Sequence, residues 1–243
     1  MQKLFRKILP LVFLSLLIQV VPILGQQMKG QHVIDPSSNV ARGLNFSNNW
    51  AGYIATGGTF TSVSGSWIVP QITAKGISAD ATWVGIGGIT DNHLIQTGTQ
   101  AVVNNKGKVS YLAWYEMLPA NSQKIPLTIN PGDSVTASII QQSADQWTIS
   151  LSDNTTGQNY QITVTYAASL SSAEWIEEMP VRGRSFIPLD NFGSVQFSAL
   201  LTVKDGTALT PSQAKAQSIV MVNPGGQVLA QSSALGRMEP VSP

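Results

Sequence analysis

The chain has 243 residues, of which 43% are hydrophobic and 11% are charged, with 21 Gly, 13 Pro and no Cys. This composition excludes a disordered or collagen-like chain and a disulfide scaffold, and the absence of Cys with only two His excludes Cys nucleophiles and Cys/His zinc sites. Without the three basic residues near the N-terminus, 11 basic residues face 13 acidic ones, which gives no indication of nucleic-acid binding. So few carboxylates leave few ion pairs to lose on protonation, which favours tolerance of acid.

Residues 1–25 have the pattern of a secretory signal peptide, because three basic residues precede the uncharged stretch Ile8–Leu24. A membrane anchor is the alternative, but Pro10 and Pro22 interrupt the apolar run. We therefore predict export to an extracellular location, with no membrane contact after signal cleavage. Residues 26–44 are polar and irregular, and we interpret them as a leader or a short propeptide.

Short β segments bounded by Gly, Pro, Asn and Asp follow, in a single predicted domain of residues 45–243. No stretch has a convincing amphipathic helix pattern, and Pro211–Ala216 is expected to form at most one or two turns. Asn104–Gly107 and Asp153–Gly157 are predicted hairpin loops, since each carries Gly where a positive φ is needed. The fold class is therefore all-β, an antiparallel sandwich. The predicted strands are Ser47–Tyr53, Gly65–Pro70, Ala81–Ile86, His93–Val103, Lys108–Leu118, Leu127–Ile129, Ser134–Gln141, Gln146–Ser152, Asn159–Tyr166, Glu174–Glu178, Ser194–Val203 and Ser218–Val222.

One segment, Ser171–Pro180, places three glutamates within five positions of a weakly charged sequence. Side chains alternate between the two faces of a strand, so Glu174 and Glu178 lie on one face and Glu177 on the other. The same rule allows Glu174 to share an outward groove with four residues of other strands, although the sequence does not give strand adjacency: Trp83, Gln96, Trp114 and Glu116. A solvated strand edge is the alternative for the three carboxyl groups.

Five motifs occur in one order along residues 47–223: Ser47-Asn-Asn-Trp-Ala-Gly-Tyr, Thr82-Trp-Val-Gly-Ile-Gly, Leu94-Ile-Gln-Thr-Gly, Ala113-Trp-Tyr-Glu-Met-Leu-Pro and Ala173-Glu-Trp-Ile-Glu-Glu. Together they resemble the glutamic peptidases, the eqolisin family. The resemblance implies a concanavalin-like sandwich of two curved antiparallel sheets, with the substrate in a concave groove. It also implies a catalytic dyad of Gln96 and Glu174, with Trp83, Trp114 and Glu116 in the groove wall. The chain departs from the fungal members at Gly87 and Leu112, where they carry acidic residues.

The implied dyad would hydrolyse peptide bonds without metal, cofactor or covalent intermediate. Glu174 would take a proton from the attacking water and give one to the leaving amine. Gln96 would donate an amide N–H to the oxyanion, and losing one such donor typically costs about 2.7–4 kcal/mol of transition-state stabilisation. The expected function is a secreted endopeptidase that acts at acid pH, a monomer with a peptide or protein substrate.

Two other functions stay open at this point. A glycoside hydrolase needs two carboxylates, for which Glu174 and Glu116 are available, but it has no obvious need for Gln96. A non-catalytic secreted binding module could keep the same scaffold. His93 is expected in a loop or at a strand end, and the glutamates that follow Glu174 are expected to be solvated or supporting residues.

Overall fold

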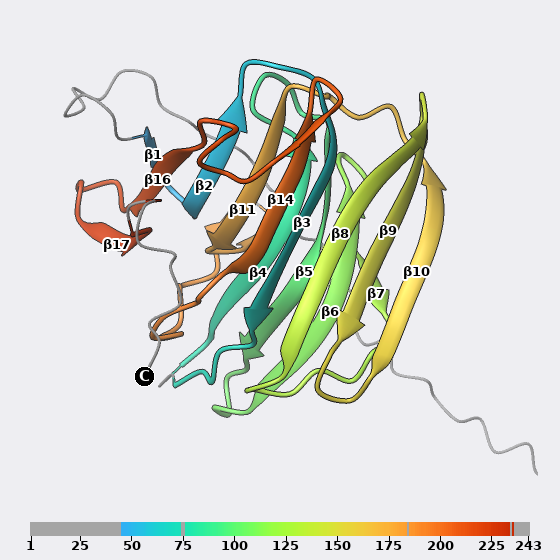
Figure 1. The fold of residues 1–243 in the computed structure, drawn as a ribbon. Coiled ribbons are helices and arrows are strands. Elements are labelled where there is room, and N and C mark those ends of the chain that lie inside the picture. The colour runs from blue at the N-terminus through green and yellow to red at the C-terminus, as the bar shows by residue number, and fades with distance from the viewer. Residues whose placement is uncertain (1–44, 74–75, 184, 234, 236–243) are drawn as a thin grey trace, which may run out of the picture.

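The computed structural model describes residues 45–73, 76–183, 185–233 and 235 (Figure 1). These residues form strands and turns without a helix, and two sheets stack as the layers of a sandwich. The predicted signal peptide at 1–25 and the predicted leader at 26–44 lie outside the described residues. Within the described part of the chain, no helix is long and apolar enough to cross a membrane.

The larger sheet has nine strands and carries the candidate site. Its neighbouring strands are antiparallel, as expected, except for β1 and β16, which pair in parallel at one edge of the sheet. These two strands come from opposite ends of the domain, so no hairpin fixes their relative direction. The strands in spatial order are β1 (Asn45–Ser47), β16 (Gln217–Val222), β2 (Trp50–Thr56), β11 (Ser172–Glu178), β4 (Ser78–Gly87), β5 (Leu94–Val103), β6 (Val109–Met117) and β7 (Gln123–Ile125), with β17 (Val228–Gln231) paired to β16.

The smaller sheet has six strands and packs against the larger one through β3 and β8, which contact β4. Its strands in spatial order are β10 (Gln158–Thr165), β9 (Gln146–Asp153), β8 (Ser134–Ser143), β3 (Phe60–Ile68), β14 (Ser198–Lys204) and β15 (Thr207–Leu209). A separate small hairpin joins β12 (Val181–Arg182) to β13 (Ser185–Phe186).

Most predicted strands are present, and both predicted hairpin loops are confirmed, with φ of +75° at Gly107 and +74° at Gly157. The prediction of a strand at Leu127–Ile129 is wrong. The segment that pairs with β6 is β7, at Gln123–Ile125, whereas Leu127 and Ile129 are buried in the core without strand pairing. Proline on either side, at positions 126 and 131, removes the N–H groups that a ladder needs. The segment Pro211–Ala216 forms a turn, as expected.

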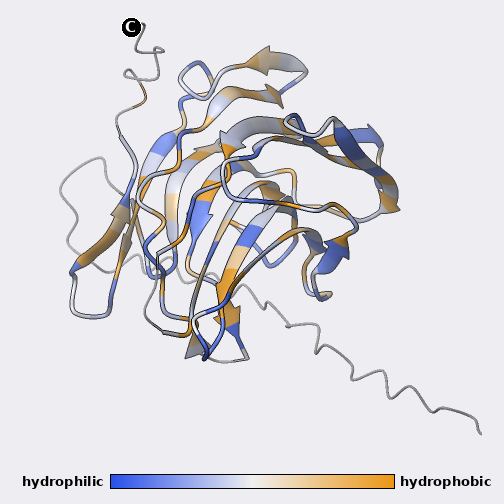
Figure 2. Ribbon diagram, turned by 90° about the horizontal axis from the view of Figure 1, so that it is seen from below, coloured by the Kyte–Doolittle hydropathy of each residue, from blue (hydrophilic) through white to orange (hydrophobic). Residues whose placement is uncertain are grey.

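Two apolar layers hold the sandwich together. One lies between the sheets and includes Trp67, Trp147 and Trp175, all fully buried. The other covers the opposite face of the nine-stranded sheet and includes Trp83 and Trp114. Figure 2 shows hydrophobic and hydrophilic positions changing along the strands. Because both faces of the central strands are buried, β4 has no exposed residue at all, and polar side chains on these strands must find partners inside the protein.

Candidate active site

Glu174 and Gln96 lie in one row of side chains that crosses four neighbouring strands. The register pairs Glu174 of β11 with Gly85 of β4, Gly85 with Gln96 of β5, and Gln96 with Glu116 of β6. Directly paired residues point to the same face of a sheet. Because strands lie about 4.8 Å apart, the Cα atoms of Glu174 and Gln96 are about 10 Å apart, with Gly85 between them.

The position of Gly85 has no room for a side chain. A Cβ atom there would lie 2.8 Å from Cζ3 of Trp83, 3.0 Å from Cδ1 of Leu94 and 3.3 Å from Oε2 of Glu174. The backbone of Gly85 is not in the left-handed region, so space rather than φ requires glycine here. The bare backbone therefore forms the floor between the two predicted catalytic residues.

Burial governs the chemistry of Glu174, whose exposed fraction is 0%. Neither of its carboxyl oxygens makes a hydrogen bond of standard geometry with a described residue. Burial raises the pKa of Glu174 well above 4.5, and the nearby hydroxyl of Ser172 offsets this rise in part. The carboxyl therefore holds its proton to a higher pH than an ordinary glutamate does, and it can act as a proton donor as well as a base.

Gln96 and Glu116 form a buried amide–carboxyl pair. Nε2 of Gln96 donates a hydrogen bond of 2.7 Å to Oε2 of Glu116, and their exposed fractions are 2% and 1%. Burial and the nearby negative charge of Glu178 raise the pKa of Glu116 to about 8, while the hydrogen bond from Gln96 opposes the rise. Glu116 was expected in the groove wall, and in the structure it contacts the predicted catalytic amide.

Glu178 is a further candidate for the site, although it was expected to be a solvated or supporting residue. It is buried rather than solvated, and it accepts hydrogen bonds from Nε1 of Trp83 at 2.8 Å and from Nδ2 of Asn49 at 3.1 Å. Burial raises its pKa to about 7 despite these donors. Asn49 belongs to the first sequence motif, so the motif was the signal, but only the fold shows which carboxyl it contacts.

The two tryptophans predicted for the groove wall, Trp83 and Trp114, lie on the same face as the row. Both are fully buried, and the ring of Trp83 meets that of Trp50 edge-on at 4.7 Å. A cavity of about 10 Å³, roughly the space for one water molecule, adjoins this layer. It is lined by Trp50, Gly88, Asn92, Leu94, Gln96, Leu118 and Glu178. Whether the tryptophans contact substrate stays a prediction.

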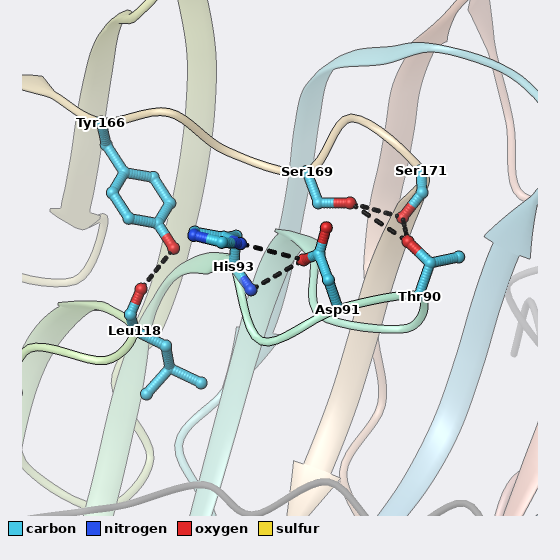
Figure 3. Close-up of polar contacts among 7 residues, drawn as sticks. All are labelled: Thr90, Asp91, His93, Leu118, Tyr166, Ser169 and Ser171. Atoms are coloured by element: carbon cyan, nitrogen blue, oxygen red, sulfur yellow. Dashed lines mark hydrogen bonds and ion pairs between the residues drawn. The ribbon is translucent and has the colours of Figure 1, made fainter.

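The loop between β4 and β5 is fastened to the segment before β11 by hydroxyl groups (Figure 3). Oγ1 of Thr90 donates to Oγ of Ser171 at 2.9 Å, and Oγ of Ser169 lies 2.8 Å from the same oxygen. In this loop His93 is more than half exposed, pairs with Asp91 at 3.4 Å and directly precedes β5, as expected for a loop or strand-end residue. The loop thus ties the strand of Gln96 to the strand of Glu174.

A second group of carboxyls lies on the opposite face of the same strands. Glu177, which was expected to be solvated or supporting, is buried and accepts a hydrogen bond of 2.7 Å from Oγ1 of Thr82. Burial first, and then the charge of Asp80, raises the pKa of Glu177 well above 4.5 and that of Asp190 to about 8. Glu177 also borders a cavity of about 530 Å³. Among the described residues no group of His, Cys, Asp or Glu has the arrangement of a metal site.

The sequence profile of the Peptidase A4 family matches residues 48–239. This chain belongs to the Peptidase A4 family. It is 28% identical to Aspergillopepsin-2 of Aspergillus niger over 219 residues, which are 79% of this chain and 76% of the relative. It is 30% identical to Scytalidopepsin B of Scytalidium lignicola over 196 residues, which are 75% of this chain and 74% of the relative.

Solved structures agree with this membership of the A4 family. Scytalido-glutamic peptidase with a transition state analog inhibitor matches with a TM-score of 0.67 and 28% identity, over 75% of this chain and 91% of the other. Aspergilloglutamic peptidase from Aspergillus niger matches with a TM-score of 0.59 and 30% identity, over 65% of this chain and 95% of the other. The predicted family, the glutamic peptidases or eqolisins, and the predicted β-sandwich are therefore confirmed.

Proposed function

We propose that this A4 family member is a secreted, acid-acting endopeptidase whose catalytic dyad is Glu174 and Gln96. The observation that carries the proposal is the row in which these two side chains flank Gly85 on one face of the sheet. Membership of the glutamic peptidase family supports a peptide substrate. One similar structure, SCP-B, 27% identical with a TM-score of 0.63, is described in a complex with the tripeptide Ala-Ile-His.

In the proposed reaction the scissile carbonyl group lies over Gly85. Ionised Glu174 takes a proton from water while the water oxygen bonds to the carbonyl carbon, and the carbonyl oxygen becomes an oxyanion that accepts an N–H of Gln96. Glu174 then gives its proton to the amide nitrogen, the C–N bond breaks, and the oxyanion returns to a carbonyl. One water molecule is consumed, and Glu174 is ionised again.

The raised pKa of Glu174 affects where on the pH scale this reaction runs. Because the first step needs the ionised carboxyl, activity should rise with pH through the pKa of Glu174, which lies well above 4.5. The first step of the proposed reaction thus needs a higher pH than it would with an ordinary glutamate. The raised pKa also makes the protonated form a ready donor for the leaving amine.

Secretion is proposed from the sequence of residues 1–25 alone. Expression of the full chain in a secreting host tests it: mature protein in the medium that has lost the predicted signal sequence, by mass spectrometry, is the expected result. Retention of the intact chain in the membrane fraction would favour the anchor instead.

The dyad is tested with Glu174→Gln and Gln96→Ala in purified mature protein, using a denatured protein substrate across acid pH. We expect kcat/KM to fall about 100-fold or more for Gln96→Ala and at least as much for Glu174→Gln. Glu177→Gln is the matched control, since it changes a buried carboxyl on the same strand but on the opposite face. Undiminished cleavage by a folded Glu174→Gln or Gln96→Ala variant contradicts the dyad.

The two other functions predict different outcomes in the same preparation. Release of reducing sugar without proteolysis would identify a glycoside hydrolase, but Glu116 already binds Gln96 and lies three strand spacings, about 14 Å at Cα, from Glu174. Peptide binding without turnover at any pH would identify a binding module. No observation in the site favours either over peptide hydrolysis.

A further inference from the structure

The pair formed by Gln96 and Glu116 is unusually poor in partners for a buried site. Nε2 of Gln96 lies 2.7 Å from Oε2 of Glu116, and the backbone of Ser122 also hydrogen-bonds to the Glu116 carboxyl. Oε1 of Gln96 and Oε1 of Glu116 are both buried and have no hydrogen-bond partner among the described residues. Buried polar atoms are nearly always paired, so two orphan acceptors in one contact call for a physical account.

The chemistry of the two groups allows a second arrangement. A carboxylate only accepts hydrogen bonds, whereas a protonated carboxyl has one O–H to donate, and an amide presents N–H on one side and C=O on the other. Ionised Glu116 must therefore accept a hydrogen bond from Nε2 of Gln96. Protonated Glu116 can instead donate its O–H to Oε1 of Gln96, which satisfies an atom that is otherwise orphaned.

The two arrangements place opposite sides of the amide over the reaction floor. In the row, Glu116 lies on one side of Gln96, and Gly85 with Glu174 lies on the other. When Nε2 faces Glu116, Oε1 faces Gly85; when Oε1 faces Glu116, Nε2 lies on the Gly85 side and can direct an N–H there. Only the second arrangement aims donors at an oxyanion, and a carbonyl oxygen there would repel it.

We propose that Glu116 is a positioning residue, whose protonated form turns the N–H groups of Gln96 toward the substrate and whose ionised form turns them away. This inference rests on the proposed function of Gln96 and deepens it, because it gives the peptidase a reason to require acid that is separate from Glu174. The orientation of one amide is the switch, and Glu116 itself does not touch the reacting atoms.

The surroundings of Glu116 support a protonated state under acid conditions. The charged or titratable groups around it are Glu178 of β11 and the phenol of Tyr166. Exposed Lys124 of β7 pairs with Trp114, two residues before Glu116 on β6. Burial and the negative charge of Glu178 raise the pKa of Glu116 to about 8. Glu116 is thus a proton donor throughout acid pH and becomes an acceptor only above neutrality.

Glu116→Gln tests the proposal because its amide can donate to Oε1 of Gln96 at every pH and never ionises. In the wild type, we expect kcat/KM to fall about tenfold for each pH unit above the pKa of Glu116. In Glu116→Gln this alkaline limb should be absent, so that the ratio of activities at pH 6 and pH 9 changes about tenfold, because a group with a pKa of about 8 is about one-tenth protonated at pH 9. Glu177→Gln, a buried carboxyl on the opposite face, should keep the wild-type limb. An alkaline limb that persists in Glu116→Gln, or one that Glu177→Gln removes equally, overturns the proposal.

A readout without catalysis separates this proposal from the proposed function. In protein labelled with 15N at glutamine side chains, the Gln96 amide signals are those lost in Gln96→Ala. We expect these signals to shift with pH in a single step in the wild type, and to be independent of pH in Glu116→Gln. Signals that do not shift, or a step that survives in Glu116→Gln, overturn the positioning role even if peptidase activity is present. A clear step in an inactive protein would instead contradict only the peptidase function.

Discussion

Glu174 lies directly opposite Gly85 in the ladder between β11 and β4, and its Oε2 would be 3.3 Å from a Cβ atom at that position. The same Cβ would lie 2.8 Å from the buried ring of Trp83, which cannot move away without disturbing the layer of side chains around it. The spacing between the two predicted catalytic residues thus depends on the absence of one methyl group.

Gly85→Ala is expected to lower kcat/KM at least tenfold while the protein remains folded. Overpacking of this kind typically lowers the free energy of unfolding by about 1–3 kcal/mol. Displacement of Trp83 or Glu174 would also disturb the position of Glu174 relative to Gln96. Kinetics with a protein substrate and thermal denaturation measure the two effects. Gly76→Ala is the control, since a Cβ there meets nothing within 4 Å. Full activity in Gly85→Ala would show that the floor of the site tolerates a side chain.

The carboxyls on the opposite face of the sheet predict a protein that is most stable in acid. The pKa values of Asp80 and Asp190 are raised to about 6 and about 8, mainly by burial. A carboxyl with a raised folded-state pKa contributes stability that is complete below its unfolded pKa and is lost as the pH rises through its folded pKa. The melting temperature should therefore fall between pH 4 and pH 8.

Asp190→Asn should reduce this fall, because the variant has no proton to lose at position 190. One kcal/mol corresponds to about 2–4 °C in a protein of this size, so a difference of several degrees at pH 8, and little at pH 4, is expected by circular dichroism. Asp145→Asn, at an exposed turn, serves as the control. Parallel melting curves for Asp190→Asn and the wild type at all pH values would show that Asp190 does not share in the effect.

Trp83→Phe tests the donor that supports Glu178. The change removes the 2.8 Å hydrogen bond to a buried carboxyl, and an unsatisfied buried group costs about 1–3 kcal/mol. The loss should be larger at pH 8 than at pH 5, because the pKa of Glu178 is about 7 and its charged form depends most on the donor.

Trp147→Phe gives the comparison, since the indole of this equally buried residue donates to the backbone carbonyl of Tyr166. Its destabilisation should not change with pH. Equal pH dependence in the two variants would mean that the Trp83 hydrogen bond does not stabilise the charge on Glu178.

The backbone at Gly87 leaves neither the conformation nor the space for a side chain. Its φ is +92°, and a Cβ atom would lie 2.3 Å from the carbonyl oxygen of His93 and 2.5 Å from that of Ser169. We expect Gly87→Ala to lower the free energy of unfolding by clearly more than Gly57→Ala, where φ is +75° but nothing lies within 4 Å. The difference in urea denaturation isolates the clash from the backbone preference. Equal losses would indicate that the loop can move to accept a Cβ atom.

The sequence was sufficient for the elements that depend on local pattern. Alternation predicted that Glu174 and Glu178 share a face and that Glu177 does not, and the register confirms it. Turn residues predicted the loops at Gly107 and Gly157. Prediction failed for Leu127–Ile129, where apolar residues serve the core without pairing.

The sequence was not sufficient for features that depend on which strands become neighbours. The burial of Glu177 and Glu178 could not be predicted, because charged residues are seldom buried and their partners Thr82 and Asn49 are about a hundred residues away. The contact between Gln96 and Glu116 likewise needed the order of β5 and β6. Composition and alternation predict which side chains can share a face, and only the pairing of strands distant in sequence determines which of them are in contact.

The parallel pairing of β1 with β16 affects how the protein can fold. Neither β1 nor β2 has a partner before residue 172, since β2 lies between β16 and β11. The first strands to leave the ribosome thus wait unpaired until most of the chain has been made. Contacts this distant in sequence slow folding, and exposed strand edges favour aggregation in the interval. The larger sheet therefore cannot be completed from its N-terminus as the chain is synthesised, and its N-terminal edge closes only after β16 has been made.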